Sequence, residues 1–596
     1  MTDLWQRLKQ RKLVQWTLAY VAAAFALLQG IDIVAQRFAW PDSIERILII
    51  AASIGFFVTL LLAWYHGERG VQKVSGTEVL LLALLLTIGG GLLWKYSAGP
   101  HSAAVASVST VAASGLHSTA SPTNAATIDV EQRSASPASI AQVANNDDDS
   151  IAVLPFVNMS SDKEQDYFSD GLSEELLNQL AQLPQLRVIA RTSSFSFKGK
   201  QVDIATIART LGVAHVLEGS VRKSGNTLRI SAQLIRASDS SQVWQQTYDR
   251  QLTDVFKVQD EIATAVVDAL KVKLLPDQHL SNAYRSSNPE AYDQYLLGKE
   301  FYNRTTPADW RKAAAAFQRA IALDPDYGAP RAGLAAAEYS LADLAGDAAS
   351  KQQALDSAEL AVAKAPRLAD AYAARGIIRL SFFRDWDGAG TDFEKALQLN
   401  PAASAAQLGN YRLLMAQGNL PEAIVAAREA TKSNPLSNLT WTSLGRALYA
   451  AGDYSAADRA LDRAREISSD SPYGNYAAGM NELAQGRARE ALTTFGTAGD
   501  VYSLAGIAMA EYSLGHARRS RQALDDMVEK YGKAGAYQIA QAHAWRGEAD
   551  KAFEWLDTAL EYNDGGLSFL KSDPVMTRLS ADPRFAALLK KMGLAE

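Results

Sequence analysis

The chain has 596 residues, 48% of them hydrophobic and 21% charged, which is long enough for several domains. Its formal net charge is −6 and it has no long basic run, so it lacks the positive footprint of a protein that binds nucleic acid. Cysteine is absent, which excludes disulfides, thiolate metal ligands and thiol nucleophiles.

Three apolar runs lie in the first hundred residues, at about 14–34, 47–64 and 79–94. Each approaches the ~20 residues that a helix needs to cross a ~30 Å hydrocarbon core. A cleaved signal peptide is the alternative for the first run, but two more runs follow it. We expect residues 1–96 to be a membrane segment with three transmembrane helices in contact with membrane lipid.

Basic residues flank these runs unequally. One side carries Arg7, Lys9, Arg11, Lys12, Arg69 and Lys73, and the other carries Arg37, Arg46 and Lys95. Because Lys and Arg are retained on the cytoplasmic side, this distribution predicts a bacterial inner-membrane protein with a cytoplasmic N-terminus. The chain after about residue 95 would then be periplasmic.

Residues 97–149 are small and polar, rich in Ser, Ala and Thr and nearly free of aromatic residues. Such a segment buries too little apolar surface to offset the entropy of ordering it. We expect a disordered linker.

From residue 150 to about 275, short strand-like and helix-like segments alternate. SIAVLPF, LRVIA and SQVWQQTYDR are typical of strands, and AHVLEGSVRKSGNTLRISAQLIRA is typical of two strands around a turn at 224–226. DYFSDGLSEELLNQLAQLP, VDIATIARTLGV and VFKVQDEIATAVVDALKV have the apolar spacing of amphipathic helices. Asp170, Glu174 and Glu175 fall near the start of the first helix, where the helix dipole favours carboxylates. The pattern predicts an α/β domain.

IAVLPFVNMSSDKEQDYFSDGLSEELLNQL, LGVAHVLEGSVRKSGNTLRISAQLI and VWQQTYDR resemble the TolB amino-terminal-like domain. In many bacterial proteins that domain stands before tetratricopeptide (TPR) repeats, some of them similar to the periplasmic parts of CadC-type regulators and some labelled adenylate cyclase. The resemblance begins only at residue 150. It therefore carries over neither the DNA-binding nor the cyclase module of those relatives.

A repeat of 34 residues runs through the following helical region. Ala389, Ala423, Ala457 and Ala491 are each 34 apart, and turn glycines recur at Gly418, Gly452 and Gly486. This period is typical of the TPR superhelix, in which small residues let two helices cross closely and Phe or Leu fills the space between hairpins. We expect about eight hairpins over residues 289–562 and a capping segment over 563–596. The predicted fold class is therefore multi-domain, with three transmembrane helices, an α/β domain and an all-α TPR superhelix.

The first helices of TPR hairpins line a concave surface that commonly binds peptide segments. Laying the regular repeats on the TPR pattern directs seven side chains toward that surface: Arg412, Met415, Arg446, Tyr449, Tyr473, Tyr476 and Met480. Packing of helix against helix is the alternative role for each of them. We expect a protein or peptide partner in this groove.

Catalytic and cofactor signatures are missing from the sequence. Its seven histidines are scattered without metal-ligand spacing, and no nucleophile elbow, phosphate loop or dinucleotide fingerprint occurs. We expect no enzyme, no cofactor and no metal. The favoured function is a membrane-anchored protein-protein interaction scaffold that presents the α/β domain and the TPR superhelix. The alternative is a receptor or signalling component that couples partner or ligand binding to a membrane or cytoplasmic partner.

Overall fold

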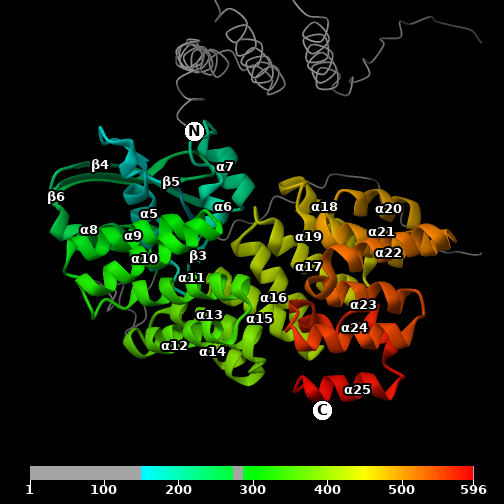
Figure 1. Cartoon of the computed structure of the whole chain (residues 1–596). Coiled ribbons are helices and arrows are strands. Elements are labelled where there is room, and N and C mark those ends of the chain that lie inside the picture. Colours follow the sequence, from blue (N-terminus) through cyan, green and yellow to red (C-terminus); the bar gives the residue numbers. More distant parts are fainter. Residues whose placement is uncertain (1–148, 273–285, 595–596) are drawn as a thin grey trace, which may run out of the picture. The chain divides into compact units, whose positions relative to one another are not determined.

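The computed structural model describes residues 149–272 and 286–594 (Figure 1). The described residues belong to one compact unit. They form a small sheet with its helices, a long series of helix pairs and a C-terminal segment.

The predicted location in a bacterial inner membrane is wrong for the part of the protein that the structure describes. Among residues 149–272 and 286–594, every helix is too short or too polar to cross a membrane. The three predicted spans and the linker at 97–149 lie outside the described residues, apart from Asp149 at the end of the linker.

Six strands form one mixed sheet in the order β3-β1-β4-β5-β6, with β2 paired to β4. Their bounds are β1 Ser150–Val153, β2 Val157–Asn158, β3 Arg187–Val188, β4 His215–Ser224, β5 Thr227–Arg236 and β6 Gln242–Gln251. β1 pairs in parallel with β3 and β4, whereas β4, β5 and β6 are antiparallel. The β4–β5 hairpin turns at Gly225, whose φ of 56° suits a residue without a Cβ. This is the turn that the sequence predicts.

Helices cover the two faces of the sheet unequally. α5 (Asp166–Leu180) and α8 (Val255–Leu270) share a large apolar core with the strands. α7 (Ile204–Leu211), which follows the short helix α6 (Arg191–Phe195), packs against β1 and the start of β4. There it forms a smaller apolar cluster with strand residues that alternate with those of the large core. This arrangement leaves β3 at one edge of the sheet and β6 at the other.

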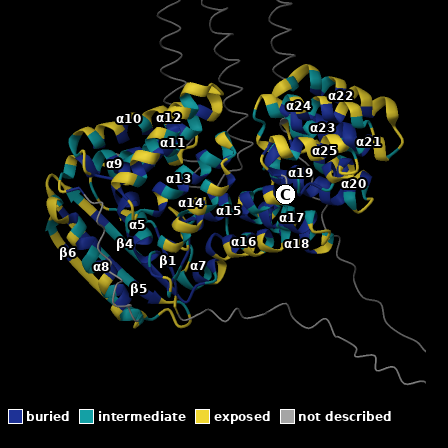
Figure 2. Ribbon diagram, turned by 90° about the horizontal axis from the view of Figure 1, so that it is seen from below, coloured by how far each residue is buried: buried dark blue, intermediate teal, exposed yellow. Residues whose placement is uncertain are grey.

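The region from 289 to 561 consists of eight successive helix pairs, where the period of 34 predicts about eight hairpins. The pairs are α9 (Pro289–Asn303) and α10 (Pro307–Leu323), α11 (Ala329–Ala345) and α12 (Ala348–Lys364), α13 (Ala369–Ile378) and α14 (Trp386–Leu399), α15 (Ser404–Gln417) and α16 (Leu420–Ser433), α17 (Asn438–Ala450) and α18 (Tyr454–Ile467), α19 (Pro472–Ala484) and α20 (Ala488–Gly496), α21 (Asp500–Ser513) and α22 (Ala517–Tyr531), and α23 (Ala536–Trp545) and α24 (Ala549–Glu561). Figure 2 shows exposed residues along α10, α12 and α22, whereas α19 is largely buried. The TPR-type repeat is therefore present in the structure.

A phenylalanine wedged against glycines joins neighbouring pairs. Each of these rings, on the second helix of its pair, touches one glycine on the first helix of the same pair and one on the first helix of the next. The sets are Phe317 with Gly298 and Gly333, Phe393 with Gly376 and Gly409, and Phe495 with Gly479 and Gly506. A Cβ added at any of these glycines would come within 2.1 to 2.7 Å of the ring. Because interiors are close-packed, glycine is required wherever the ring sits.

The sheet and the first helix pair share one hydrophobic core. Tyr292 of α9 is fully buried, and its hydroxyl accepts a hydrogen bond of 2.8 Å from Gln259 Nε2 of α8. A Cβ at Gly171 of α5 would lie 2.6 Å from Leu296 of α9, so the two helices approach closely. The predicted division between residues 275 and 289 therefore does not separate two independent cores.

Largely buried charges reinforce the same contact. Lys299 Nζ of α9 lies 3.1 Å from Glu174 Oε1 and 2.8 Å from Glu175 Oε1, while Arg191 Nε lies 2.8 Å from Glu174 Oε2. Burial alone would raise the pKa of Glu174, but the charges of Lys299 and Arg191 outweigh burial and lower it. Of the carboxylates that the sequence assigns to a helix dipole, Glu174 and Glu175 thus form ion pairs with the first repeat, whereas Asp170 pairs with Lys198.

We expect Gly409→Ala to lower the free energy of unfolding by about 1–3 kcal/mol, because the new Cβ would lie 2.3 Å from the Phe393 ring. Gly496→Ala is the matched control, since a Cβ there meets nothing within 4 Å. Alanine is the better helix former by about 1 kcal/mol, so the control should be neutral or stabilising. Urea denaturation of both variants measures the difference, and equal stability would contradict the wedge model.

Candidate functional site

The seven predicted groove residues lie on α15, α17 and α19, and the structure brings six of them together. Met415, Arg446, Tyr449, Tyr476 and Met480 line one small space of about 20 Å³, enough for about one water. Tyr473 joins them because the Arg446 guanidinium carbon lies 4.9 Å from its ring centroid. Arg412 is half-buried and does not line this space.

These side chains do not face open solvent. Met415, Tyr449, Tyr476 and Met480 are all buried. Burial raises the pKa of the Tyr449 and Tyr476 hydroxyls well above the usual value. The Tyr476 hydroxyl donates a hydrogen bond of 2.8 Å to Gln541 Oε1 of α23. Their assignment to a partner-binding groove stays a prediction.

The chain's own C-terminal segment covers them. It continues from α24 through two single turns, Gly565–Phe569 and Met576–Leu579, to α25 (Pro583–Lys591). The Arg446 guanidinium carbon lies 3.8 Å from the Phe569 ring centroid, and Asp573 Oδ2 accepts hydrogen bonds from Tyr537 Oη at 2.9 Å and from Gln541 Nε2. Leu570, Val575 and Met576 are fully buried there.

The same segment reaches back to the third helix pair. Asn563 Nδ2 donates to the Ser381 carbonyl at 2.7 Å, within a π-helical turn over Arg379–Phe383. Trp386 Nε1 donates to the Met592 carbonyl at 2.8 Å. The segment predicted to cap the last hairpin therefore also spans the pairs from α13 to α23.

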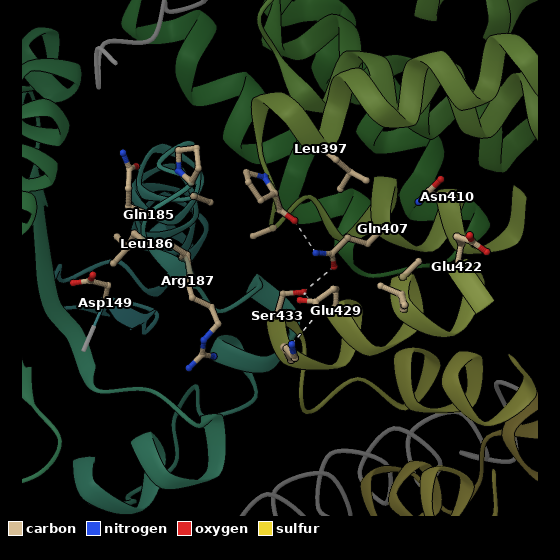
Figure 3. Close-up of a pocket in the computed structure, with 18 of the residues that line it drawn as sticks. Asp149, Gln185, Leu186, Arg187, Leu397, Gln407, Asn410, Glu422, Glu429 and Ser433 are labelled. Atoms are coloured by element: carbon tan, nitrogen blue, oxygen red, sulfur yellow. Dashed lines mark hydrogen bonds and ion pairs between the residues drawn. The ribbon is translucent and has the colours of Figure 1, made fainter. Parts of the chain in front are cut away.

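A larger space lies elsewhere, between the edge of the sheet and α14 to α16. It has a volume of about 980 Å³ (Figure 3). The sheet side contributes the end of α5, the following loop and the edge strand β3, and the helical side contributes α14, α15 and α16. We call this space the β3 cleft.

Apolar side chains line the walls of the β3 cleft. On the sheet side they are Ala181, Pro184, Leu186 and Val188, and on the helical side they are Leu397, Ala402, Leu414, Val425 and Ala426. Val425 is 60% exposed, which is unusual for a large aliphatic side chain on a repeat helix. Exposed apolar surface of this kind, rimmed by polar groups, is typical of an interaction site.

Polar contacts hold the base of the cleft in place. Ser433 Oγ donates to Gln407 Oε1 at 2.7 Å, and Gln407 Nε2 donates to the Pro401 carbonyl at 2.7 Å. These bonds join α16, α15 and the loop after α14, as the dashed lines in Figure 3 show. The cleft is thus bounded by a fixed frame on its helical side.

The rim of the cleft has an excess of free negative charge. Asp149 and Glu422 have no ion-pair partner among the described residues. Glu429 Oε1 pairs with Lys432 Nζ at 2.8 Å, and Arg187 donates to the neutral Gly212 carbonyl, so three carboxylates and two basic groups line the cleft. A cation entering the cleft would therefore meet unneutralised carboxylates.

The junction beside the cleft joins two segments that are far apart in the sequence. Ser193 Oγ donates to Asn434 Oδ1 at 2.6 Å and accepts from the Leu436 amide at 2.9 Å, while the Ala190 amide donates to the Ser433 carbonyl at 2.7 Å. Ser193 is fully buried. These bonds set the spacing of the two walls.

Sequence reasoning missed the β3 cleft because its walls come from segments more than 200 residues apart. One signal was available in LPEAIVAAREATKS of α16. There Val425 falls off the buried stripe of Ala423, Ala427 and Ala430 and lies between two glutamates. Among the described residues, no group of three or more His, Asp or Glu side chains is placed to hold a metal ion.

Comparisons with known proteins match parts of the chain. A family model described as HilA/YgeH-like transcriptional regulator, second domain, matches residues 147–265. A protein of Rhizobium meliloti (strain 1021) named putative adenylate cyclase 3 is 42% identical over 197 residues, which is 33% of this chain and 32% of that protein. The chain thus spans about a third of this relative's length. The TolB-like resemblance stays a prediction, since these comparisons name another family for the same residues.

Solved helical-repeat structures are similar only distantly. PilF of Pseudomonas aeruginosa is 17% identical, with a TM-score of 0.25, over 34% of this chain and 94% of that one. YrrB, described as a TPR protein with an unusual peptide-binding site, is 20% identical, with a TM-score of 0.22, over 35% of this chain and 95% of that one. The repeat assignment rests on the chain's own period and helix pairs.

We expect Ser193→Ala to lower the free energy of unfolding by about 1–3 kcal/mol, because Asn434 Oδ1 and the Leu436 amide would lose their buried partner. Ser455→Ala on the exposed face of α18 is the control, with an expected change within about 0.5 kcal/mol. Urea denaturation compares the two. Equal stabilities would show that the junction contributes nothing to folding.

Proposed function

We propose that the protein is an interaction scaffold that binds an extended segment of a partner protein in the β3 cleft. The observation that carries this proposal is the pairing of apolar walls with free carboxylates on the rim. The partner segment would supply aliphatic or aromatic side chains to the walls and at least one Lys or Arg to the rim.

The size and openness of the cleft favour a peptide over a small metabolite. Its volume of about 980 Å³ lies at the upper end of the about 300–1,000 Å³ typical of small-molecule sites. Pro184, Glu422, Val425, Glu429 and Lys432 on its rim are exposed, so the cleft is open along one side. An elongated ligand can lie in such a cleft without being enclosed.

The edge strand supports the same proposal. Within residues 149–272 and 286–594, β3 ends the sheet and pairs only with β1, and Leu186, Arg187 and Val188 line the cleft. Extended peptides commonly bind beside a sheet edge, where main-chain groups and alternate side-chain pockets are both within reach. The resemblance of residues 150–275 to a domain found before TPR repeats supports a joint role for the two regions. The receptor alternative has no observation of its own in its favour.

Display of random peptides on phage, selected against the described region, tests the proposed ligand chemistry. We expect enrichment of peptides with apolar residues next to Lys or Arg, because only these match both the walls and the rim. Val425→Glu should weaken the selected peptides at least tenfold by placing a charge on the apolar wall. Leu360→Glu on α12 is the matched control, since Leu360 is 45% exposed and does not line the cleft. Equal loss in both variants would contradict binding in the cleft.

Reversal of the rim charge tests the electrostatic part separately. Glu422→Lys should weaken the binding of the basic peptides, because the attractive charge is removed. It should not make that binding depend more strongly on apolar residues or on salt. Glu529→Lys on the exposed face of α22 makes the same change of net charge away from the cleft. Isothermal titration at low and high salt compares the two, and an unchanged affinity for Glu422→Lys would remove the rim from the proposal.

A further inference from the structure

The inner face of the helix pairs from α15 to α23 holds residues 564–580 through side chains of the kind that recognise peptides. On the helical side these are an arginine, two tyrosines and a glutamine: Arg446, Tyr476, Tyr537 and Gln541. Arg446 contacts Phe569 of the segment, Tyr537 and Gln541 contact Asp573, and Tyr476 hydrogen-bonds to Gln541. Aromatic and arginine side chains commonly dominate the energy of peptide and protein interfaces.

The groove contacts two side chains of the segment that are four residues apart, an aromatic ring and a carboxylate. The Phe569 ring packs under the Arg446 guanidinium, at 3.8 Å from its carbon. The Asp573 carboxylate accepts from Tyr537 Oη at 2.9 Å and from Gln541 Nε2. Hydrogen bonds to a carboxylate are stronger than those between neutral groups, so the aromatic ring and the carboxylate define a pattern.

The receiving side chains are held in place by contacts outside the segment. Gln541 Oε1 accepts from the Tyr476 hydroxyl at 2.8 Å, which orients its amide nitrogen toward Asp573. The Arg446 guanidinium also stacks on Tyr473, with its carbon 4.9 Å from the ring centroid. Tyr476 in turn packs at 5.7 Å between centroids against Phe495, the ring of the glycine wedge. Contacts within the repeats therefore hold Arg446 and Gln541 in place.

The segment itself has little regular structure. Between α24 and α25 it makes only two single turns, Gly565–Phe569 and Met576–Leu579. Its internal hydrogen bonds are short-range turns, such as those from the Leu570 amide to the Leu567 carbonyl and from the Thr577 amide to the Asp573 carbonyl. Its position against the repeats therefore depends on its contacts with the groove. As a tethered ligand it would occupy the groove at an effective concentration on the order of millimolar.

We propose that this inner face is a second peptide site, that it reads an aromatic residue followed four positions later by an aspartate, and that residues 564–580 are its resident, exchangeable ligand. A partner segment with the same pattern binds when it displaces the resident one. This site is distinct from the β3 cleft, whose lining residues it does not share.

A labelled synthetic peptide of residues 562–580 tests the proposal by fluorescence anisotropy. The receiving protein is the full chain with Phe569→Ala and Asp573→Asn, which weaken the resident segment and leave the groove residues unchanged. We expect the peptide to bind this variant at least tenfold more tightly than the unmodified chain, because the competing segment is weaker. Adding Arg446→Ala should reverse that gain, and a peptide with the same two substitutions should not bind.

Binding that is absent in every variant, or that persists unchanged after Arg446→Ala, would overturn the proposal. Hydrogen exchange on the unmodified chain provides a second measurement that does not depend on a variant folding. Amides of residues 564–580 should exchange faster than those of α15 and α23, because the segment leaves while the repeats stay folded. If these amides exchange hydrogen at the same rate as those of α15 and α23, the segment is a fixed part of the fold. That result would contradict its proposed displacement from the groove.

Discussion

The contact between a phenylalanine ring and two glycines is the constraint on which the helical region depends. At three junctions between helix pairs of the described region it sets how closely one pair approaches the next, because a ring on the second helix occupies the space that two absent Cβ atoms leave open. Tyr476 packs against one of these rings, Phe495, and also hydrogen-bonds to Gln541. Packing between repeats and orientation of the inner face are thus one connected system. A change at a wedge glycine would disturb the side chains that hold residues 564–580.

Two surfaces with different chemistry result from this arrangement. The inner face is lined by Arg446 and tyrosines and is filled by a segment that supplies an aromatic ring and a carboxylate. The β3 cleft is apolar with free carboxylates on its rim, and nothing in the described chain fills it. We propose an acidic aromatic segment as the ligand of the first surface and a basic apolar segment as the ligand of the second. A scaffold with both could hold two partners, or two parts of one partner, without competition between them.

The joint between the sheet and the repeats makes these surfaces parts of a single body. A shared core around Tyr292, the buried ion pairs of Lys299 and the Ser193–Asn434 hydrogen bond fix the sheet to the helices at separate places. Breaking a buried ion pair by removing one partner is costly because the other charge remains buried. The walls of the β3 cleft are therefore held apart by contacts outside the cleft itself.

The sequence by itself determined the local elements and the repeat. Strands such as Ser150–Val153, the Gly225 turn and the period of 34 depend on neighbouring residues or on a regular spacing, and they are visible without the fold. It also placed Arg446, Tyr449 and Tyr476 on one face, since a repeat puts equivalent positions in line. Only the tertiary structure decided what covers that face and where an open cleft remains. Phe569 meets Arg446, and Ser193 meets Asn434, across more than a hundred residues of intervening chain. Such contacts follow from how helix pairs stack and where the chain returns, and no local pattern encodes them.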